Sequence, residues 1–192
     1  MPENSLFAIV LAAGSASRYG ATKQLAEFNG RPLVCRAARV AESVCARNSV
    51  LVVGNDWQKV AAACEPLLGF MVVNDNYAEG IGASLSAGVS SVAEVAGAVL
   101  ILLADQPLIT QGHLQQLIEA WRASPNSIVA SAYAGTAGPP VIFPRAYFAD
   151  LMSLTKDRGA RSILGAARDR VLTVRCDDAA IDIDEPGDLD RL

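Results

Sequence analysis

Short apolar runs alternate with longer amphipathic segments along the chain, and this alternation predicts the fold. The runs are rich in Val, Ile and Leu and cover residues 7–12, 50–53, 70–73, 98–104 and 128–132. Runs with so few polar positions are typical of strands that are buried on both faces of a parallel sheet. A shorter apolar run at residues 141–143 follows a stretch in which the pattern loosens.

Helical periodicity fills much of the space between these runs. Residues 32–46 and 110–121 repeat apolar side chains every three or four positions, and the hydroxyl of Thr110 is placed to cap the second segment. We predict two further helices at residues 145–154 and 160–168. Strands that alternate with helices indicate an α/β fold with a mostly parallel sheet, in which ligands bind beyond the carboxyl ends of the strands.

Composition limits the size, the partners and the location of the protein. With 192 residues, 52% of them hydrophobic, the chain can bury a sizeable core, and we expect one domain over residues 1–192. A formal net charge of −4 gives no general attraction for nucleic acid or acidic membranes, so we expect neither as a partner. The longest apolar stretch is far shorter than the roughly 20 residues that cross a bilayer, and we expect a cytoplasmic protein.

The cysteines and the single histidine receive structural interpretations. The four cysteines form no C-x-x-C pair and lie in or beside apolar segments, so we expect small buried side chains rather than disulfides or zinc ligands. His113 follows a turn at a predicted helix start, and we expect a surface residue there rather than a catalytic base.

The first candidate site is the segment at residues 11–25, L-A-A-G-S-A-S-R-Y-G-A-T-K-Q-L. Its glycines allow a tight backbone, its serines offer hydroxyls, and Arg18 and Lys23 bring two cations, which together suit a polyphosphate. The segment lacks the G-K-S or G-K-T ending of a P-loop, and Gly14 and Gly20 are too far apart for a dinucleotide fingerprint. An ordinary exposed turn between a strand and a helix is the alternative.

This segment resembles the signature of the MobA-like nucleotidyltransferases, most closely that of the molybdenum cofactor cytidylyltransferase branch. The family transfers a nucleoside monophosphate from a nucleoside triphosphate to a phosphorylated acceptor. The resemblance implies a Rossmann-like three-layer α/β/α sandwich of the nucleotide-diphospho-sugar transferase type. It also implies nucleotide binding by residues of the loop, namely Leu11, Ala12, Ala13, Gly14, Ser15, Arg18 and Lys23.

The second candidate site is Asp105-Gln106-Pro107, which follows the apolar run at residues 98–104. A carboxylate just past a buried strand suits Mg²⁺, because this ion takes few protein oxygens and completes its shell with water and substrate phosphates. Capping of the turn toward Thr110 is the alternative role for Asp105. The D-Q-P segment also resembles its counterpart in the cytidylyltransferase branch, which favours the metal-binding role.

A third acidic segment lies near the end of the chain, A-I-D-I-D-E-P-G-D-L at residues 180–189. We predict a short strand in which Asp182 and Asp184 point to the same face and bind the metal together with Asp105. The segment resembles the family's I-D-I-D-T-P-E-D stretch, in which one acidic residue completes the metal site. Which aspartate binds stays open, and solvated charges at a strand edge are the alternative.

Two weaker segments complete the predicted site. The Gly-rich residues 74–88 resemble the family's base-contacting segment, which implies nucleotide contacts by Asn74, Gly80 and Ser84; an ordinary capped connection is the alternative. Residues 155–164, T-K-D-R-G-A-R-S-I-L, resemble the family's G-D-x-G-A-R stretch. We expect the acceptor's phosphate to be bound by Lys156, Arg158 and Arg161, with plain surface charge as the alternative. Pro139 stands where the family commonly has a histidine, so no role of that histidine is carried over.

Together these segments predict a Mg²⁺-dependent enzyme that transfers CMP from CTP to the phosphate of the molybdenum-pterin cofactor. Lys23 is expected to act on the α-phosphate, Arg18 on the leaving pyrophosphate, and Asp105 on the metal. A molybdoenzyme or its maturation chaperone is a further expected partner. The alternatives are a guanylyltransferase using GTP or a relative with another acceptor, an NAD(P)-binding oxidoreductase, and a non-catalytic nucleotide or cofactor carrier.

Overall fold

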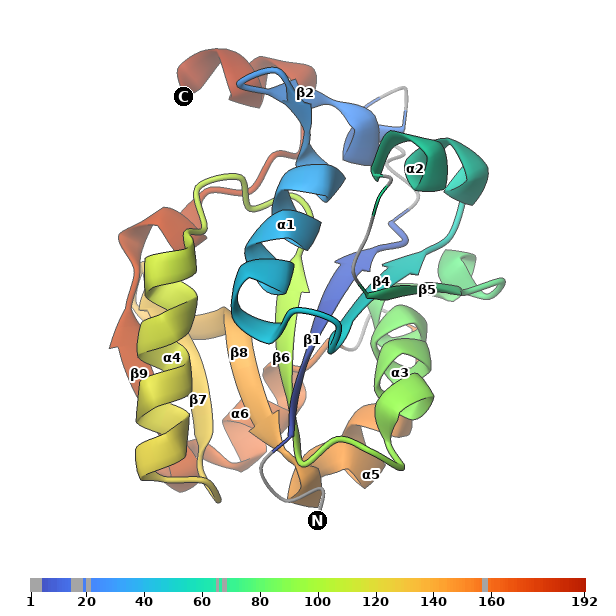
Figure 1. Cartoon of the computed structure of the whole chain (residues 1–192). Coiled ribbons are helices and arrows are strands. Elements are labelled where there is room, and N and C mark those ends of the chain that lie inside the picture. Colours follow the sequence, from blue (N-terminus) through green and yellow to red (C-terminus); the bar gives the residue numbers. More distant parts are fainter. Residues whose placement is uncertain (1–4, 15–18, 20–21, 65, 67–68, 157–158) are drawn as a thin grey trace.

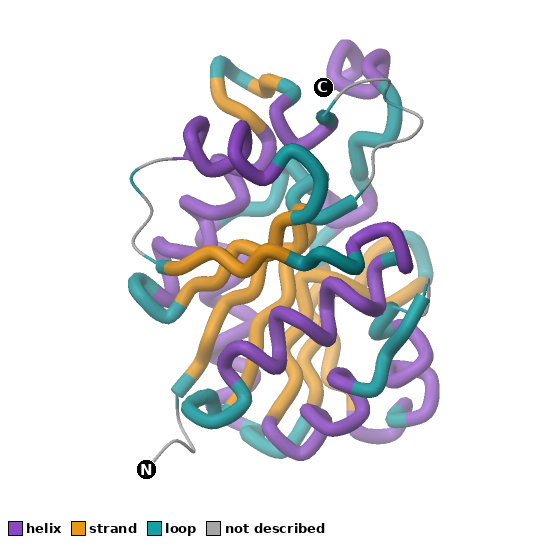
Figure 2. The backbone as a smooth tube through the Cα atoms, turned by 90° about the vertical axis from the view of Figure 1, so that its right-hand side faces the viewer, coloured by secondary structure: helices purple, strands orange, loops and turns teal. Residues whose placement is uncertain are grey.

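A computed structural model of the protein describes residues 5–14, 19, 22–64, 66, 69–156 and 159–192, and contains a central sheet with helices on both faces (Figure 1 and Figure 2). The sheet has seven strands in the order β5-β4-β1-β6-β8-β7-β9. The strands are β1 (Leu6–Ala12), β4 (Ser49–Val53), β5 (Phe70–Val73), β6 (Ala98–Leu103), β7 (Ile128–Tyr133), β8 (Thr136–Pro144) and β9 (Val171–Arg175). β8 is antiparallel to β6 and β7, and all other neighbouring pairs are parallel.

The helices form two layers, one on each face of this sheet. The helices are α1 (Leu33–Cys45), α2 (Trp57–Cys64), α3 (Ile81–Val92), α4 (Gln111–Ala123), α5 (Phe148–Met152) and α6 (Arg161–Ala166). In Figure 1, α1 and α4 lie in front of the sheet, whereas α3, α5 and α6 lie behind it. A separate antiparallel pair, β2 (Glu27–Phe28) and β3 (Arg31–Pro32), leads into α1.

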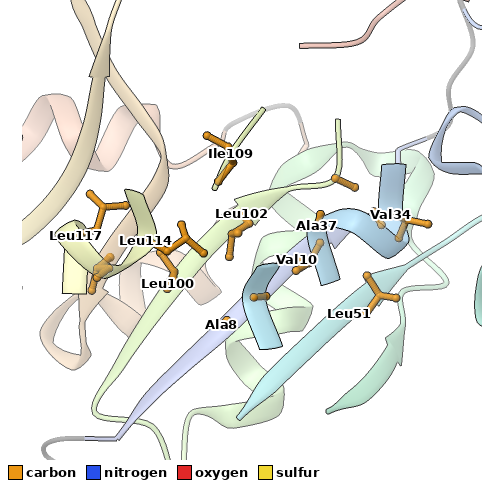
Figure 3. Packing of buried hydrophobic residues seen from close by; sticks show 14 of the residues in the cluster. Ala8, Val10, Val34, Ala37, Leu51, Leu100, Leu102, Ile109, Leu114 and Leu117 are labelled. Atoms are coloured by element: carbon orange, nitrogen blue, oxygen red, sulfur yellow. The ribbon is translucent and has the colours of Figure 1, made fainter. Parts of the chain in front are cut away.

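Strict alternation along the strands builds the two hydrophobic cores. On β1, Ala8 and Val10 face the α1 and α4 layer, whereas Ile9 and Leu11 face the α3 layer. β6 alternates in the same way, and Figure 3 shows Leu100 and Leu102 among the side chains of the first core. Because successive side chains of a strand point to opposite faces, an uninterrupted apolar run is what a sheet covered on both sides requires.

The predicted α/β class and three-layer architecture are confirmed. All five predicted apolar runs form strands, namely β1, β4, β5, β6 and β7, with ends within about one residue of the prediction. The predicted helix at residues 145–154 is divided into a 3-10 turn at Arg145–Tyr147 and α5. The helix predicted at residues 160–168 is shorter and ends at Ala166.

Three parts of the carboxyl-terminal half differ from the predictions. The short run at residues 141–143 belongs to a nine-residue strand, β8, whose register with β7 shifts where Pro139 and Pro140 enter it. Proline is tolerated there because an irregular position needs no backbone N–H for the ladder. β9 was not predicted. The prediction of a strand around Asp182 and Asp184 is wrong, because this segment is irregular. The backbone N–H groups of Asp184 and Glu185 donate to the Asp188 side chain and not to a neighbouring strand.

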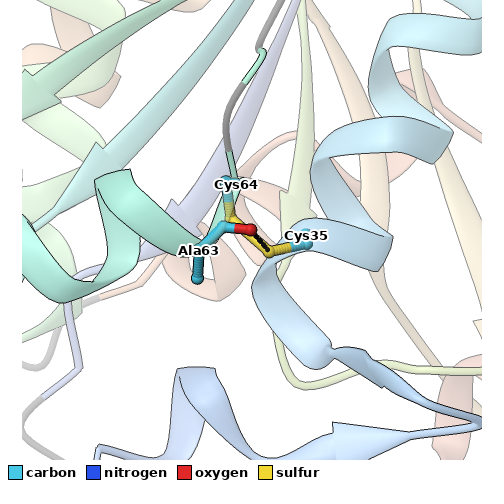
Figure 4. The surroundings of a disulfide bond; sticks show 3 residues. All are labelled: Cys35, Ala63 and Cys64. Carbon is cyan, nitrogen blue, oxygen red and sulfur yellow. Dashed lines mark hydrogen bonds between the residues drawn. A yellow bond between two sulfur atoms is a disulfide. The ribbon is translucent and has the colours of Figure 1, made fainter.

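The expectation that the cysteines stay unpaired is also wrong. Cys35 on α1 and Cys64 on α2 form a disulfide with a Cα–Cα distance of 5.0 Å (Figure 4). The two residues are 29 positions apart, so a search for closely spaced cysteines does not pair them; packing of α2 against α1 brings them together. Cys45 and Cys176 are free.

His113 lies inside the protein and not on its surface as predicted. Its side chain packs between α4 and the sheet, 7% exposed, with Nε2 2.8 Å from the hydroxyl oxygen of Ser131. The Ser131 hydroxyl donates its proton to the Pro140 carbonyl at 2.7 Å, so it accepts a hydrogen bond from Nε2–H of a neutral imidazole. This chain of hydrogen bonds ties α4 to β7 and β8.

Candidate active site

The candidate site lies at the carboxyl end of the parallel strands, where β1 and β6 are neighbours. β1 leads into the predicted nucleotide loop, and β6 leads into Asp105. The backbone N–H of Ala104 donates to the carbonyl of Leu11 with an N···O distance of 3.1 Å, which keeps the two strand ends together. The first two candidate segments of the sequence therefore meet at one edge of the sheet.

The beginning of the loop can reach a ligand only through its backbone. The side chains of Leu11, Ala12 and Ala13 are buried in the two cores, whereas Gly14 is exposed. Ser15 and Arg18, predicted to bind the nucleotide, lie outside the described residues. Lys23 is the described cation of this segment, in a 3-10 turn at Lys23–Leu25.

Lys23 joins two of the three predicted metal ligands. Its ammonium Nζ lies 2.8 Å from Oδ2 of Asp105 and 3.2 Å from Oδ1 of Asp184. The Lys23 side chain is 15% exposed, the Asp105 side chain 26% and the Asp184 side chain 63%. Burial alone would lower the pKa of Lys23, but the carboxylate of Asp105, and then that of Asp184, outweigh it and raise this pKa. Lys23 is therefore a firmly charged cation.

Two contacts that the sequence did not reveal hold Lys23 in place. The Thr22 hydroxyl donates to Oδ2 of Asp56 at 2.6 Å, which anchors the turn to the segment between β4 and α2. The buried side chain of Gln24 donates from Nε2 to the Gly14 carbonyl at 2.7 Å, which anchors the other side to the end of β1. No motif marked Thr22, Gln24 or Asp56, because their contacts join distant parts of the chain.

Asp182 approaches the same carboxylate from the end of the chain. The backbone N–H of Ile183 donates to the Asp105 carbonyl at 2.9 Å, so Asp182 and Asp184 stand on either side of a fixed point. Burial, and then the negative charge of Asp105, raise the pKa of Asp182 to about 6 although part of this residue stays exposed. A cation bound next to Asp182 would offset this repulsion and favour its ionised carboxylate.

The donor set fits a hard divalent cation. Oδ1 of Asp105 is buried and has no hydrogen-bond partner among the described residues, and carboxylate oxygens are the ligands that Mg²⁺ and Mn²⁺ prefer. Within the part of the chain that the structure describes, no three acidic, His or Cys side chains are close enough to form a finished metal cage. The ammonium of Lys23 contacts both Asp105 and Asp184, and its single charge balances only one of the two carboxylates.

The predicted nucleotide residues of the β5–α3 loop are brought together inside the protein. Nδ2 of Asn74 donates to the Ser84 hydroxyl oxygen at 3.0 Å, and Oδ1 of Asn74 accepts from the Asn76 N–H at 3.0 Å. Both Asn74 and Ser84 are buried, so their polar groups hold the loop. Gly80 precedes α3 with φ of 110°, a backbone conformation that favours glycine. Their contact with a nucleotide stays a prediction.

The predicted acceptor residues lie in two places. The carbonyl of Lys156 accepts from the Gly82 N–H at 2.8 Å and so covers the first turn of α3. Arg161 begins α6 on the other side of the site, exposed to solvent. Arg158 lies outside the described residues. Lys156 and Arg161 therefore share no contact among the described residues.

Tyr133 links Asp182 to Arg161 and was missed by the sequence analysis. Burial, and then the nearby carboxylate of Asp182, raise the pKa of Tyr133, while Arg161 and the amide of Gln106 act in the opposite direction. The Tyr133 hydroxyl lies so close to the Cα of Gly138 on β8 that any side chain at that glycine would overlap it. Tyr133 is thus fixed at the end of β7, between the acidic centre and the α6 side.

Comparison with known proteins identifies the family. A model of the MobA-like NTP transferase domain matches residues 8–173. The chain belongs to the MobA-like NTP transferase family. The family resemblance inferred from the sequence is confirmed, and the match includes residues 11–25 and Asp105 but ends before residues 180–189; the fold of a nucleotidyltransferase is confirmed as well. Among the described residues, no helix has the length and apolar character needed to span a membrane.

Three relatives indicate how widely the family has diverged. The purine catabolism protein PucB of Bacillus subtilis (strain 168) is 30% identical over 200 residues, which covers 97% of this chain and 95% of PucB. The nicotine blue oxidoreductase of Paenarthrobacter nicotinovorans is 31% identical over 135 residues, 70% of this chain and 65% of that protein. The crystal structure of Rv0371c from Mycobacterium tuberculosis H37Rv in complex with manganese has a TM-score of 0.79 at 27% identity, covering 98% of this chain and 97% of that one.

Proposed function

We propose that the protein is a Mg²⁺-dependent cytidylyltransferase that transfers CMP from CTP to the phosphate of the molybdenum-pterin cofactor and releases pyrophosphate. The observation that carries the proposal is the Lys23 ammonium between Asp105 and Asp184 at the end of β1 and β6. A lysine ammonium beside these carboxylates supplies what a triphosphate with its metal needs, namely one positive group for phosphate and oxygen ligands for the ion. The L-A-A-G and D-Q-P sequences favour the cytidylyl branch.

In this reaction an oxygen of the acceptor's phosphate attacks the α-phosphorus of CTP, a new P–O bond forms, and the bond to the β-phosphate breaks. The acceptor phosphate is already an anion, so no general base is required and catalysis rests on positioning and charge neutralisation. When bound, the divalent ion would neutralise the phosphate oxygens. Asp105, with Asp182 or Asp184, would hold that ion, which is consistent with the manganese complex of the relative Rv0371c.

Lys23 and Arg18 have separate roles in the proposal. When the nucleotide binds, the Lys23 ammonium leaves the carboxylates and donates to the α-phosphate, where negative charge builds up in the transition state. Arg18 neutralises the departing pyrophosphate. Gln24 and Asp56 keep the Lys23 turn close to Asp105 throughout, because their contacts anchor it to the segments that follow β1 and β4.

Two other functions share the same fold and need to be separated from this one. A guanylyltransferase, or a relative with another phosphorylated acceptor, would use the same lysine and carboxylates. An oxidoreductase is a second candidate because one relative, the nicotine blue oxidoreductase, carries that name. It would bind a nicotinamide dinucleotide without needing Asp105 as a metal ligand.

Calorimetric titration with CTP, GTP, ATP and NADPH, each with and without Mg²⁺, tests the proposal. We expect CTP to bind best and only with Mg²⁺, and we expect Asp105→Asn to abolish the metal dependence. Asp190→Asn is the matched control. It removes an exposed carboxylate near Asp182 and Asp184 in the sequence, outside the proposed metal ligands, and should leave nucleotide binding unchanged. A preference for GTP would move the protein to the guanylyl branch. Tight binding of NADPH whose affinity changes neither with Mg²⁺ nor with the Asp105→Asn substitution would refute the proposed transferase function.

A further inference from the structure

A cleft with an excess of positive charge opens beside the candidate active site. It lies between the β7–β8 turn, α6 and β9, which are neighbours at one end of the sheet (Figure 1), and has a volume of about 800 Å³. Arg161, Arg168 and Arg175 line it, and we call it the arginine cleft. Among its described lining residues Asp177 is the one acidic side chain, so the lining carries a formal charge of +2 in a chain of −4.

Local geometry explains why the three arginines face one space. Arg161 begins α6, Arg168 begins the 3-10 turn that follows this helix at Arg168–Arg170, and both residues line the cleft. On β9, Thr173 and Arg175 are two positions apart and point to the same side of the sheet. The cleft is therefore built by two elements that converge.

The strand order separates this cleft from the nucleotide loop. The loop follows β1, the cleft lies at β7 and β9, and β6 with Asp105 at its end stands between them. Tyr133 borders the cleft and is also influenced by the carboxylate of Asp182. Tyr133 therefore stands between the cleft and the acidic centre, and a molecule in the cleft would contact it.

The chemistry of the cleft favours an anionic organic ligand. Guanidinium groups bind carboxylate and phosphate oxygens in pairs, and a cleft of this size accommodates a ligand of several rings or a long substituted chain. Arg175 is paired with Asp177 at 2.7 Å, but both side chains are highly exposed, at 84% and 68%, and such a pair contributes little. An incoming anion can replace Asp177 at small cost.

We propose that the arginine cleft binds the far end of the acceptor, and that the acceptor therefore carries a second anionic group remote from the phosphate that attacks the nucleotide. This inference rests on the proposed transfer reaction and names the class of its second substrate: a doubly anionic phosphorylated molecule. In this proposal Arg161, which like Asp182 acts on Tyr133, binds on the side of the reacting centre, and Arg168 and Arg175 hold the remote group.

The first test uses inorganic phosphate as the probe and needs no turnover. Protein labelled with ¹⁵N-arginine is titrated with phosphate, and the guanidinium N–H signals are followed by NMR. We expect the signals of Arg161, Arg168 and Arg175 to shift together along one saturable curve. The affinity of the Arg168→Gln/Arg175→Gln variant for phosphate should be lower by about tenfold or more. Arg170→Gln is the matched control, since Arg170 is exposed, lies two positions from Arg168 and lines a different cleft. Shifts of all exposed arginines in proportion to phosphate would mean an adventitious ion only, and would refute the site.

The second test links the cleft to the reaction through pyrophosphate release with CTP and the molybdenum-pterin phosphate. The double variant should raise KM for the acceptor about tenfold or more and leave kcat and KM for CTP unchanged. An unchanged acceptor KM would refute the assignment of the cleft to the acceptor. If the wild type does not turn over, the proposed reaction fails, whereas the phosphate titration still decides whether the cleft binds anions. An unchanged melting temperature of the variant excludes a loss of folding as the cause.

Discussion

Replacing Lys23 by glutamine should strengthen the binding of Mn²⁺ to the nucleotide-free protein while it destroys turnover. In the free protein the Lys23 ammonium lies 2.8 Å from Asp105 and 3.2 Å from Asp184, in the place where a divalent ion would bind these carboxylates. An entering ion must first break these contacts. Glutamine keeps a polar side chain of similar length but removes the competing charge.

The expected size of the effect follows from the two contacts. A hydrogen bond to a charged partner contributes about 1.5–3 kcal/mol, and the contact with Asp184 adds little because that side chain is 63% exposed. Asp105 is itself 26% exposed, so solvent screens part of the remainder. We take about 1.5–2 kcal/mol for the whole competition, which corresponds to a dissociation constant for Mn²⁺ about 10- to 30-fold lower in Lys23→Gln.

Electron paramagnetic resonance of free Mn²⁺ measures this constant without any substrate. Lys59→Gln is the matched control, because Lys59 pairs with Asp56 and not with the acidic centre, so its Mn²⁺ affinity should equal that of the wild type. Adding Asp105→Asn to Lys23→Gln should cancel the gain. Equal or weaker Mn²⁺ binding by Lys23→Gln would refute the competition between lysine and metal. In the wild type the same competition predicts that metal and triphosphate bind cooperatively, because phosphate draws Lys23 away.

Three further predictions concern Asp105, the buried side chain of His113 and the disulfide. Asp105→Asn should lower turnover by at least about a hundredfold with little change in melting temperature, and near-normal turnover would exclude it as a metal ligand. Burial lowers the pKa of His113, so the unfolded chain binds its proton first and the stabilisation by the neutral imidazole is lost as the pH falls below about 6.5. The difference in melting temperature between wild type and His113→Gln should therefore shrink from pH 7.5 to pH 5, and a constant difference would contradict this. Because one disulfide is present, the denatured but unreduced protein should show two reactive thiols, and the reduced protein should show four. The Cys64→Ser variant loses the link to Cys35, 29 positions away, and its free energy of unfolding should be lower by about 3 kcal/mol.

The sequence predicted the parts of the fold that depend on local pattern. Apolar runs identified β1, β4, β6 and β7 because strands buried on both faces leave few polar positions, and they identified β5 because it is apolar although partly exposed. β9 is an edge strand that contains Thr173 and Arg175, and Leu172 and Thr173 are exposed, so it has no apolar run. β8 contains Pro139 and Pro140, which argue against a strand unless the register shifts there.

The sequence also predicted some residues of the candidate site and missed others. Lys23 and Asp105 were predicted because each follows a strand that the pattern identifies, and strand ends meet at one edge of the sheet. Tyr133, Gln24 and Asp56 were missed because their contacts depend on strand order and loop closure. The disulfide between Cys35 and Cys64 was missed for the same reason: the packing of α2 on α1 decides it, and the sequence contains no marker of that packing.

The free site is electrostatically unsatisfied, and this state itself argues for its function. Oδ1 of Asp105 has no hydrogen-bond partner among the described residues, and the pKa of Asp182 rises to about 6 beside it. Lys23 contacts Asp105 and Asp184, but its single positive charge does not balance two carboxylates, and it leaves that oxygen unpaired. Keeping like-charged carboxylates close together costs free energy, which a site selected for stability alone would avoid. The arrangement suits a site that binds a divalent cation, and a lysine held beside these carboxylates is suited to receive the anion that arrives with the ion.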